Sequence, residues 1–459
     1  MLTKDYLEKI KKEGGTVLSD IFNSGINNNE IIFILNNLGR LPAGFKGDTF
    51  IPLLNHPNDK IRLLTVKNIG KLCNDSYLGV IAYIAKTDDN TMIRREAIST
   101  IGRMRTEKAI PILIKQLNDK DPKVVLQAIR ALFIFKNIKK VEKSLKELFK
   151  HPNETIKSVI EKEFSNKPKS DVKHSQSPAT MQNVLVQGDV RKILKVIPDE
   201  TIHLTFTSPP YYNARDYSIF KSYNEYLDFL KNVFSEVYRI TKEGRFFILN
   251  TSPIIIPRVS RQHSSKRYPI PFDIHSFLIE IGWEFIDDII WVKPEASVKN
   301  RNAGFLQHRK PLAYKPNPRT EYVMVYRKQT DKLLDWNIKQ YDSKITDKSK
   351  VLGEYETSNV WFIDPCFDKV HSAVFPLELC RRVITFYSFV NDLVFDPFGG
   401  SGTLAKAALE LERYFLLTEI KGDYVKRIKN RLAKQALLEP KKPAFFSLKE
   451  FIKKCKKEL

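Results

Sequence analysis

Residues 393–403 read Leu-Val-Phe-Asp-Pro-Phe-Gly-Gly-Ser-Gly-Thr, and this stretch decides the fold of the second part of the chain. A short apolar run ends in an acidic residue, Asp396, a turn rich in glycine follows, and a helix is predicted from Leu404. Glycines let the backbone approach a ligand closely, and a helix N-terminus presents free N–H groups. In open α/β sheets such turns lie at the carboxyl edge of a strand, where ligands bind. The stretch therefore predicts a nucleotide-type binding loop, and a glycine-rich turn without a ligand is the alternative.

The sequence around this stretch alternates between β-rich runs and helical stretches from Val184 onward. Strands are predicted at residues 183–186, 203–207, 245–250, 285–291, 322–326, 393–395 and 414–418. Helices are predicted between them, at residues 223–240, 274–281, 377–387 and 404–411. Strand–helix alternation of this kind implies an α/β fold with a doubly wound sheet.

A second acidic residue follows the predicted strand at residues 414–418. This residue, Glu419, lies about 20 residues beyond the glycine turn. A carboxylate at this position can accept hydrogen bonds from both ribose hydroxyls of an adenosyl group. An ordinary surface glutamate is the alternative, and the preceding glycine turn favours the ribose role.

A Ser-Pro-Pro-Tyr turn, residues 208–211, directly follows another predicted strand. Two consecutive prolines hold the chain extended and remove two N–H donors, so carbonyl oxygens remain as acceptors. The Ser208 hydroxyl and the Pro209 carbonyl can accept both protons of an exocyclic amino group and orient its nitrogen toward a methyl donor. Tyr211 supplies a flat face on which a base can stack. An isolated Pro-Pro motif would instead indicate a plain loop.

Residues 183–437 resemble the amino-methyltransferase superfamily, and the order of the two motifs matches its beta class. In that class a Ser/Asp-Pro-Pro-Tyr motif precedes an Asp-Pro-Phe-x-Gly-Ser-Gly motif, as residues 208–211 precede residues 396–402 in this chain. Further segments with family-like patterns lie at residues 187–189, 194–199, 213–217, 225–227, 244–247, 290–294 and 371–376. The resemblance implies a DNA amino-methyltransferase with a circularly permuted, Rossmann-like seven-stranded fold and S-adenosylmethionine as cofactor.

The resemblance also implies roles for individual residues. Catalysis falls to Ser208, Pro209, Pro210 and Tyr211. The cofactor-binding residues that it implies are Asp189 for the adenine, His371, Phe375 and Pro376 around the methionine end, and Asp396, Pro397, Phe398, Gly399, Gly400, Ser401, Gly402, Thr403 and Glu419. No metal is expected, because the sulfonium of the methyl donor is already activated.

The residue before the catalytic prolines bears on the base that is methylated. It is Ser208, whereas Asp is typical of the N6-adenine members of the family. The family associates Ser with N4 of cytosine, so we expect methylation of cytosine N4 in duplex DNA by base flipping. N6-adenine methylation is the first alternative. A non-catalytic nucleic-acid scaffold and an RNA substrate are the others, and the intact motifs argue against the scaffold.

Two basic stretches lie in the predicted methyltransferase region, one at residues 258–267 and one between the predicted strands at 285–291 and 322–326. Arg and Lys bind phosphates, and Arg, Asn and Gln can contact base edges in pairs of hydrogen bonds. A solvated loop is the alternative. The residues expected to contact DNA are Arg258, Arg261, Lys299, Arg301, Arg309, Lys310 and Lys315.

The N-terminal third repeats itself with an offset of about 32 residues. Residues 61–70 align with residues 93–102 and with residues 124–132, and a weaker copy starts at Ile156. Each copy follows a polar turn and is paired with a second amphipathic stretch, so the repeats must stack to bury their apolar faces. The pattern resembles short HEAT-like repeats and predicts an all-α solenoid.

The expected domains are a HEAT-like α-solenoid at residues 1–165, a linker at 166–182, a methyltransferase domain at 183–440 and a basic tail at 441–459. The formal net charge is +23, of which the first 165 residues carry roughly +9, and this excess favours a nucleic-acid partner over the alternative of a merely lysine-rich surface. We expect double-stranded DNA and a cognate restriction endonuclease as partners, within a restriction or epigenetic system.

The sequence also bears on the compartment. The first 15 residues are charged throughout and do not resemble a signal peptide, and no apolar run reaches the roughly 18 residues of a membrane helix. The four cysteines are scattered and are expected to be reduced thiols. These features predict a cytoplasmic, nucleoid-associated protein of a prokaryote.

Overall fold

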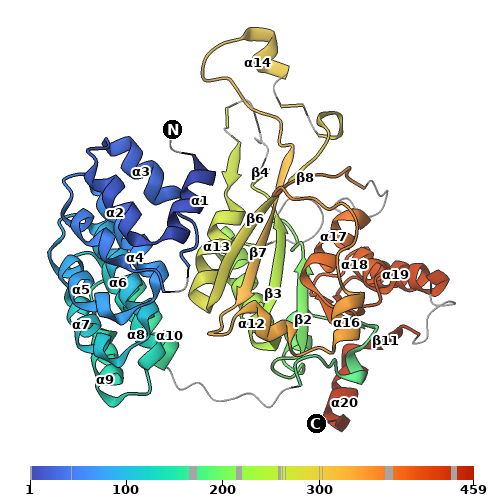
Figure 1. Ribbon diagram of the computed structural model, residues 1–459. Coiled ribbons are helices and arrows are strands. Elements are labelled where there is room, and N and C mark those ends of the chain that lie inside the picture. The colour runs from blue at the N-terminus through green and yellow to red at the C-terminus, as the bar shows by residue number, and fades with distance from the viewer. Residues whose placement is uncertain are drawn as a thin grey trace. The chain divides into compact units, whose positions relative to one another are not determined.

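The computed structural model describes residues 3–42, 44–164, 173–212, 220–256, 260, 262–263, 265–298, 300–301, 303–366, 376–435 and 442–458. The chain divides into two compact units, Met1–Pro168 and Lys169–Leu459 (Figure 1). Among the described residues, no helix combines the length and the apolar character needed to cross a membrane.

The N-terminal unit is a stack of short helices. Three helices, α1 (Lys4–Glu13), α2 (Gly15–Asn23) and α3 (Asn28–Asn37), precede the repeats. The repeats consist of α4 (Asp59–Leu72), α5 (Leu78–Thr87), α6 (Thr91–Met104), α7 (Ile110–Lys115), α8 (Pro122–Leu132), α9 (Lys139–Glu147) and α10 (Glu154–Phe164), joined by short 3-10 segments. Figure 1 shows α4, α6 and α8 stacked in one row and α5, α7 and α9 in another. This arrangement confirms the predicted HEAT-like solenoid.

The polar turns between repeats act as helix caps. Side-chain oxygens of Asn58, Asn90 and Asp121 accept hydrogen bonds from backbone N–H groups in the first turns of α4, α6 and α8. Asn153 makes the same bond to the N–H of Ile156 in α10, at 3.2 Å. Each such cap stabilises its helix by about 1 kcal/mol. The regular spacing of these polar residues therefore sets where α4, α6, α8 and α10 begin.

A repeated ion pair joins neighbouring repeats. Arg62 Nε lies 2.8 Å from Asp88 Oδ2, and Arg94 Nε lies 2.9 Å from Asp119 Oδ2. The same arginines donate to the backbone carbonyls of His56 and Asp88, at 2.9 and 3.0 Å. Because both pairs are largely buried and bidentate, they fix the register of one repeat on the next.

The C-terminal unit is built on a nine-stranded sheet with the order β11-β1-β10-β9-β2-β3-β7-β6-β8. The strands are β1 (Val184–Gln187), β2 (Ile202–Thr207), β3 (Thr241–Thr251), β6 (Trp283–Val292), β7 (Thr320–Lys328), β8 (Val360–Phe362), β9 (Leu393–Asp396), β10 (Tyr414–Glu419) and β11 (Ala444–Ser447). Among the described strands of this sheet, β7 alone runs antiparallel to its neighbours. A separate hairpin joins β4 (Ile254–Ile256) to β5 (Lys266–Tyr268).

Helices cover both faces of this sheet, so it is doubly wound as predicted. The helices that pack on one core are α11 (Val190–Leu194), α12 (Tyr223–Ile240), α13 (Ile270–Ile281) and α20 (Leu448–Glu458). Those that pack on the other core are α17 (Leu377–Tyr387), α18 (Thr403–Glu410) and α19 (Gly422–Gln435). Successive strand residues alternate between the two cores. Phe247 and Leu249 of β3 belong to the first core, whereas Ile248 belongs to the second. This alternation follows from the period of two along a buried strand.

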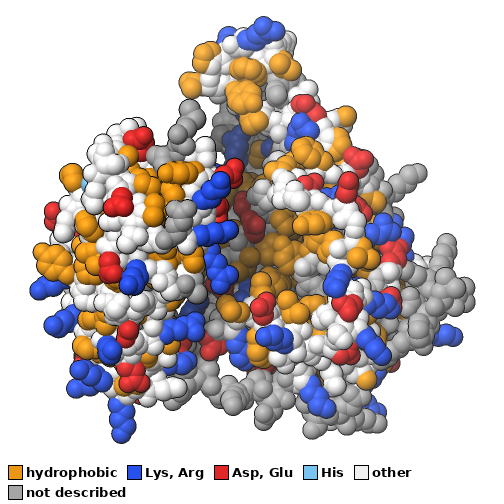
Figure 2. Space-filling view, in the orientation of Figure 1, with side chains coloured by type: hydrophobic (Ala, Val, Ile, Leu, Met, Phe, Trp, Pro, Cys, Tyr) orange, Lys and Arg blue, Asp and Glu red, His pale blue; other side chains and the backbone are white. Residues whose placement is uncertain are grey.

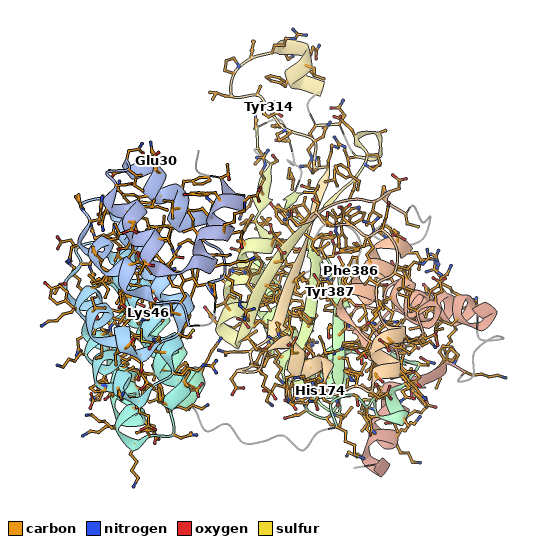
Figure 3. The ribbon with its side chains drawn as sticks, viewed as in Figure 1. Glu30, Lys46, His174, Tyr314, Phe386 and Tyr387 are labelled. Carbon is orange, nitrogen blue, oxygen red and sulfur yellow. The ribbon has the colours of Figure 1, made fainter. Side chains whose placement is uncertain are left out.

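Two of the expected domain boundaries need correction. The expected basic tail at residues 441–459 contains β11, which pairs with β1, and α20, whose Phe451 is fully buried. The expected linker contains His174, which is buried and bonded to the Glu243 carbonyl at 3.0 Å. Figure 3 labels His174 beside the lower ends of β2 and β3. The described part of the expected linker, from residue 173 onward, therefore packs on the nine-stranded sheet.

Candidate functional site

A single pocket brings the two sequence motifs together. It lies at the carboxyl ends of β1, β2, β9 and β10, and has a volume of about 280 Å³. Residues 208–211, residues 396–401, Asp189, Thr403 and Glu419 line it. The parallel order β1-β10-β9-β2 explains this convergence, because the segments that follow neighbouring parallel strands leave the sheet at the same edge.

The glycine turn is shaped by close backbone contacts. The Gly399 N–H donates to the Thr418 carbonyl at 2.8 Å, and the Gly402 N–H donates to the Gly399 carbonyl at 2.8 Å. A Cβ at Gly399 would lie 3.2 Å from the Thr418 oxygen, and Gly400 and Gly402 have φ angles of +50° and +74°. A side chain at these positions would crowd the loop or strain it. The turn leads directly into α18, so the helix N-terminus lies next to the pocket.

Asp396 is buried at the base of the pocket, with 2% of its surface exposed. Its Oδ1 accepts hydrogen bonds from the Thr207 hydroxyl at 2.6 Å and from the Phe398 N–H at 2.9 Å. Burial raises the pKa of this carboxyl group to about 7, against the lowering effect of these two bonds, and the charge of Glu419 raises it further. Thr207 directly precedes the Ser208–Tyr211 turn, so its hydrogen bond to Asp396 joins this turn to the glycine turn.

Glu419 holds the opposite side of the glycine turn. Its Oε2 accepts from the Gly400 N–H at 2.9 Å, and its Oε1 accepts from the Lys421 N–H at 2.8 Å. Burial raises the pKa of Glu419 above its ordinary value, although these backbone N–H groups lower it. The carboxylate is therefore fixed at the pocket wall by the loop that it faces.

The Ser208–Tyr211 turn places Tyr211 against a buried polar network. The Tyr211 hydroxyl donates to Glu321 Oε2 at 3.4 Å, and burial raises the pKa of the phenol. Asn250 Nδ2 donates to the same oxygen at 2.7 Å, and Lys293 forms an ion pair with the other oxygen of Glu321. The Lys293 ammonium also lies 4.8 Å from the centre of the Trp291 ring. One end of the tyrosine is thus anchored while the residue lines the pocket.

Sequence reasoning did not assign a role to this network. Glu321 and Lys293 lie on β7 and directly after β6, which are separated by a long excursion in the sequence. The available signal was a carboxylate directly before the strand predicted at residues 322–326. Its partner could be identified only once the antiparallel pairing of β6 with β7 placed Trp291 opposite Glu321.

Asp189 lines the pocket but is already paired. Its side chain caps α11 by accepting from the Arg191 N–H at 2.9 Å, and its Oδ2 lies 2.7 Å from Arg191 Nη2. Hydrogen bonds from the Arg191 side chain lower the pKa of this carboxyl group, although partial burial opposes them. The expected contact with an adenine would therefore be made by a carboxylate that Arg191 also holds.

An apolar wall of the pocket was not predicted. Phe229 has its ring centre 5.5 Å from that of Phe220 and 6.1 Å from that of Phe398. Ile420 also lines the pocket and is 65% exposed. Its position directly after Glu419 was the available signal in the sequence.

Some predicted site residues lie elsewhere. Gly402 belongs to the turn but faces α19, where an added Cβ would lie 3.0 Å from Ile428. Pro376 is the N-cap residue of α17 and does not line the pocket. His371 and Phe375 lie outside the described residues.

The described basic residues of the expected DNA-binding set lie on the excursion between β6 and β7. This excursion carries α14 (Ala303–His308), and Tyr314, labelled in Figure 3, packs its ring 5.2 Å from that of Phe305. Arg309, Lys310 and Lys315 are exposed. Arg301 is half-buried, and burial and the nearby Arg267 lower its pKa. None of these four lines the pocket. Arg258, Arg261 and Lys299 lie outside the described residues.

Comparison with known proteins gives matches to both units. A family model described as DNA methylase matches residues 202–430, and a model for HEAT repeats matches residues 47–133 and 80–162. The Type II beta methyltransferase M.BslI of Bacillus sp. (strain NEB-606) is 32% identical over 268 residues, which are 56% of this chain and 28% of that protein. The Type II methyltransferase M.ScaI of Streptomyces caespitosus is 29% identical over 272 residues, which are 56% of this chain and 83% of that protein.

Among solved structures, the PvuII DNA methyltransferase (cytosine-N4-specific) aligns with a TM-score of 0.42 and 21% identity. That alignment covers 61% of this chain and 95% of the other.

The doubly wound sheet, the glycine turn and the two acidic residues at its carboxyl edge define a methyltransferase of the S-adenosylmethionine-dependent class. The C-terminal unit of this chain belongs to the DNA methylase family, and HEAT repeats precede it in the N-terminal unit.

Proposed function

We propose that the C-terminal unit transfers a methyl group from S-adenosylmethionine to the exocyclic N4 amino group of a flipped-out cytosine in duplex DNA. The observation that carries this proposal is the shared pocket, which is lined by the Ser208–Tyr211 turn, by the glycine turn at residues 396–401 and by Glu419. A methyl acceptor and a methyl donor must meet within bonding reach for the transfer to occur, and one pocket that holds both motifs meets this requirement.

The pocket residues fit an adenosyl cofactor. Glu419 presents a carboxylate that can accept from ribose hydroxyls, and Gly399 leaves the backbone uncovered where a Cβ would crowd the Thr418 carbonyl. Ile420 and the phenylalanine wall supply apolar surface for a purine ring. When bound, S-adenosylmethionine supplies an electrophilic methyl carbon on a sulfonium sulfur.

The catalytic turn would orient the amino group of the target base. The Ser208 hydroxyl and the Pro209 carbonyl would accept its two protons, which leaves the nitrogen lone pair directed toward the methyl donor. Tyr211 would present its ring to the flipped base, while its hydroxyl stays bonded to Glu321. A neutral serine orients the amino group without taking up charge, and the product loses its extra proton after transfer.

The basic excursion between β6 and β7 would contact the DNA around the target base. Arg309, Lys310 and Lys315 are exposed on a segment that projects from the sheet (Figure 1). Such residues bind phosphates, and arginine can also contact guanine edges. Arg301 would belong to the same surface. Arg258, Arg261 and Lys299 are proposed as DNA contacts from the sequence alone. Relatives named as Type II methyltransferases support a role in a restriction system. A cognate restriction endonuclease would be the partner in such a system.

The identity of the product tests the proposal. Plasmid DNA from cells that express the protein, digested to nucleosides and analysed by mass spectrometry, is expected to contain N4-methyl-2′-deoxycytidine. A Ser208→Ala variant that folds normally serves as the matched control and should remove the signal. N6-methyl-2′-deoxyadenosine in place of N4-methyl-2′-deoxycytidine would overturn the choice of base but not the reaction class. The absence of both modifications from DNA, with purified enzyme and cofactor, would overturn the reaction itself.

A further inference from the structure

Helices α4, α6 and α8 of the HEAT repeats carry basic side chains at equivalent exposed positions. These residues, called the basic face below, are Lys60, Lys67 and Lys71 of α4, Arg103 of α6, and Lys123 and Arg130 of α8. Counted from the N-cap residue of its helix, each one occupies the second, ninth or thirteenth position, and each position is used by two helices. Positions seven and eleven residues apart lie on the same side of an α-helix. The six side chains therefore share one face of the row formed by α4, α6 and α8.

The charge on this face is largely uncompensated. Helix α8 contains no acidic residue, and Glu96 of α6 is engaged by Arg103 at 2.9 Å. Among the described residues, Lys67, Lys123 and Arg130 form no ion pair with a carboxylate. In the other row, α5 and α7 carry one lysine each, Lys86 and Lys115, whereas α9 carries Lys139, Lys140, Lys143 and Lys146. Figure 2 shows Lys and Arg side chains following one another down one edge of the N-terminal unit.

Contacts with neighbouring residues hold Arg103 of the basic face in a defined position. A Cβ at Gly70 of α4 would lie 2.2 Å from Arg103 Nη2, so this glycine leaves room for the guanidinium to lie across the neighbouring helix. Ser99 and Thr100 oxygens accept from Arg103 at 3.1 and 2.9 Å and fix it in place. Burial and the positive charges of Lys11 and Lys67 lower the pKa of Lys71. Positive groups crowded in this way are stabilised by an anion.

The dimensions of the face match a nucleic-acid duplex. Two steps between packed helices span about 18 Å, and eleven residues along a helix span about 16 Å. The major groove of B-DNA is about 12 Å wide and the minor groove about 6 Å wide. Charges spread over this area can reach phosphates on both sides of a groove.

We propose that the basic face of the HEAT repeats binds the phosphate backbone of the duplex DNA on which the C-terminal unit acts. This inference rests on the proposed function, because it takes duplex DNA as the substrate. The contact would be independent of base sequence and would add affinity without taking part in methyl transfer.

The salt dependence of DNA binding tests the proposal on the full-length protein. A Lys67→Ala/Arg130→Ala variant removes two charges of the basic face, and a Lys86→Ala/Lys115→Ala variant removes two charges of the other row. Binding to a fluorescent 40-base-pair duplex of random sequence would be measured by anisotropy over a range of salt concentrations. Each lost phosphate contact reduces the slope of log affinity against log salt by about 0.9. We expect a reduction of about 1.8 in the first variant and none in the second.

Further variants separate the possible outcomes. A Lys67→Arg/Arg130→Lys variant keeps both charges and should retain the wild-type slope. Equal slopes in wild type and in Lys67→Ala/Arg130→Ala would overturn the proposal, as would equal reductions in both alanine variants. Methyl incorporation at saturating DNA, measured in parallel, should stay at the wild-type level in the first variant. If the wild type methylates no DNA but the slopes differ as expected, the proposed function fails and the DNA contact stands.

Discussion

Burial of the Asp396 carboxylate lowers the free energy of unfolding at neutral and alkaline pH. Burial raises its pKa from an ordinary value near 3.8 to about 7. Between these two pH values the folded protein holds a proton that the unfolded chain has released, so the free energy of unfolding falls as the pH rises through this window. At pH 8 the full cost of the buried charge is present. We expect the cofactor to require an acidic group at this position.

An Asp396→Asn variant should therefore be more stable than the wild type at pH 8, by on the order of 2 kcal/mol. Asparagine can keep the acceptor oxygen that Thr207 and Phe398 bond but carries no charge. The difference in the free energy of unfolding should narrow at pH 5, where the folded forms of both proteins are neutral at this site. Urea denaturation at the two pH values measures it. A wild type that is more stable than the variant at pH 8 would contradict the argument from the buried charge. The variant should also lose the ability to bind the cofactor.

Tyr211 offers a test of the base-binding role. A Tyr211→Ala change removes a stacking surface worth roughly 1–3 kcal/mol, so methyl transfer per encounter with DNA should fall by roughly 5- to 150-fold. A Tyr211→Phe variant keeps the ring and loses the hydroxyl bond to Glu321, and it should retain more activity. Cofactor affinity, measured by calorimetry, should change little in both. Wild-type transfer rates in Tyr211→Ala would sink the stacking role.

Glu419 is expected to act on the cofactor alone. A Glu419→Ala change removes charge-assisted hydrogen bonds to the ribose worth roughly 1.5–3 kcal/mol, which corresponds to a roughly 10- to 150-fold rise in the Kd for S-adenosylmethionine. It also frees the Gly400 N–H, so the loop should be checked by hydrogen exchange. Affinity for DNA should stay close to that of the wild type. Unchanged cofactor binding in this variant would contradict the ribose role.

At the scale of elements, the amino ends of β2, β3 and β9 enclose a buried ionic cluster. His203 is fully buried between the His174 carbonyl, at 2.9 Å, and the Leu393 N–H, at 3.1 Å. Arg245 pairs with Asp392, whose pKa is lowered because the arginine and the other partners outweigh the effect of burial. Burial lowers the pKa of His203 to about 3 and that of His174 to about 4.

These histidines should make the C-terminal unit sensitive to acid. Below about pH 6.5 the unfolded chain binds protons that the folded histidines exclude, so stability falls as the pH drops from about 6.5 toward 4. A His174→Gln variant should show a shallower loss over this range than the wild type. Urea denaturation at pH 7 and pH 5 gives the comparison, and the opposite trend of Asp396 cancels because both proteins contain it. Equal losses in the two proteins would contradict the contribution of His174.

The accuracy of the sequence-based predictions depended on how much of the signal is local. The bounds of α12 and α17 agree with prediction, and the seven predicted strands all lie in the sheet, because apolar periodicity and turn residues are encoded within each segment. The three-residue strand β8 and the strand β11 were missed, because each is defined by its pairing with β6 or β1. Glu321 was missed for the same reason, since its partners are distant in sequence.

At the scale of the whole molecule, the chain is two units with separate cores. The buried apolar residues of the HEAT repeats form one cluster, and those of the methyltransferase sheet form two others that share no residue with it. The catalytic and cofactor motifs that have been described all lie in the C-terminal unit. The repeats should therefore be separable from the chemistry.

A truncated protein that lacks residues 1–168 should fold, bind S-adenosylmethionine with the affinity of the full chain, and methylate DNA when DNA is saturating. Its affinity for DNA should be lower, and its salt dependence weaker, because the phosphates contacted by the repeats are no longer neutralised. Circular dichroism and calorimetry establish that the truncated protein is folded and binds cofactor before its activity is measured. A protein that passes both checks, yet transfers no methyl group at any DNA concentration, would show that the repeats belong to the catalytic machinery. Equal salt slopes for the full and truncated proteins, with normal transfer, would instead assign the repeats to a partner other than DNA.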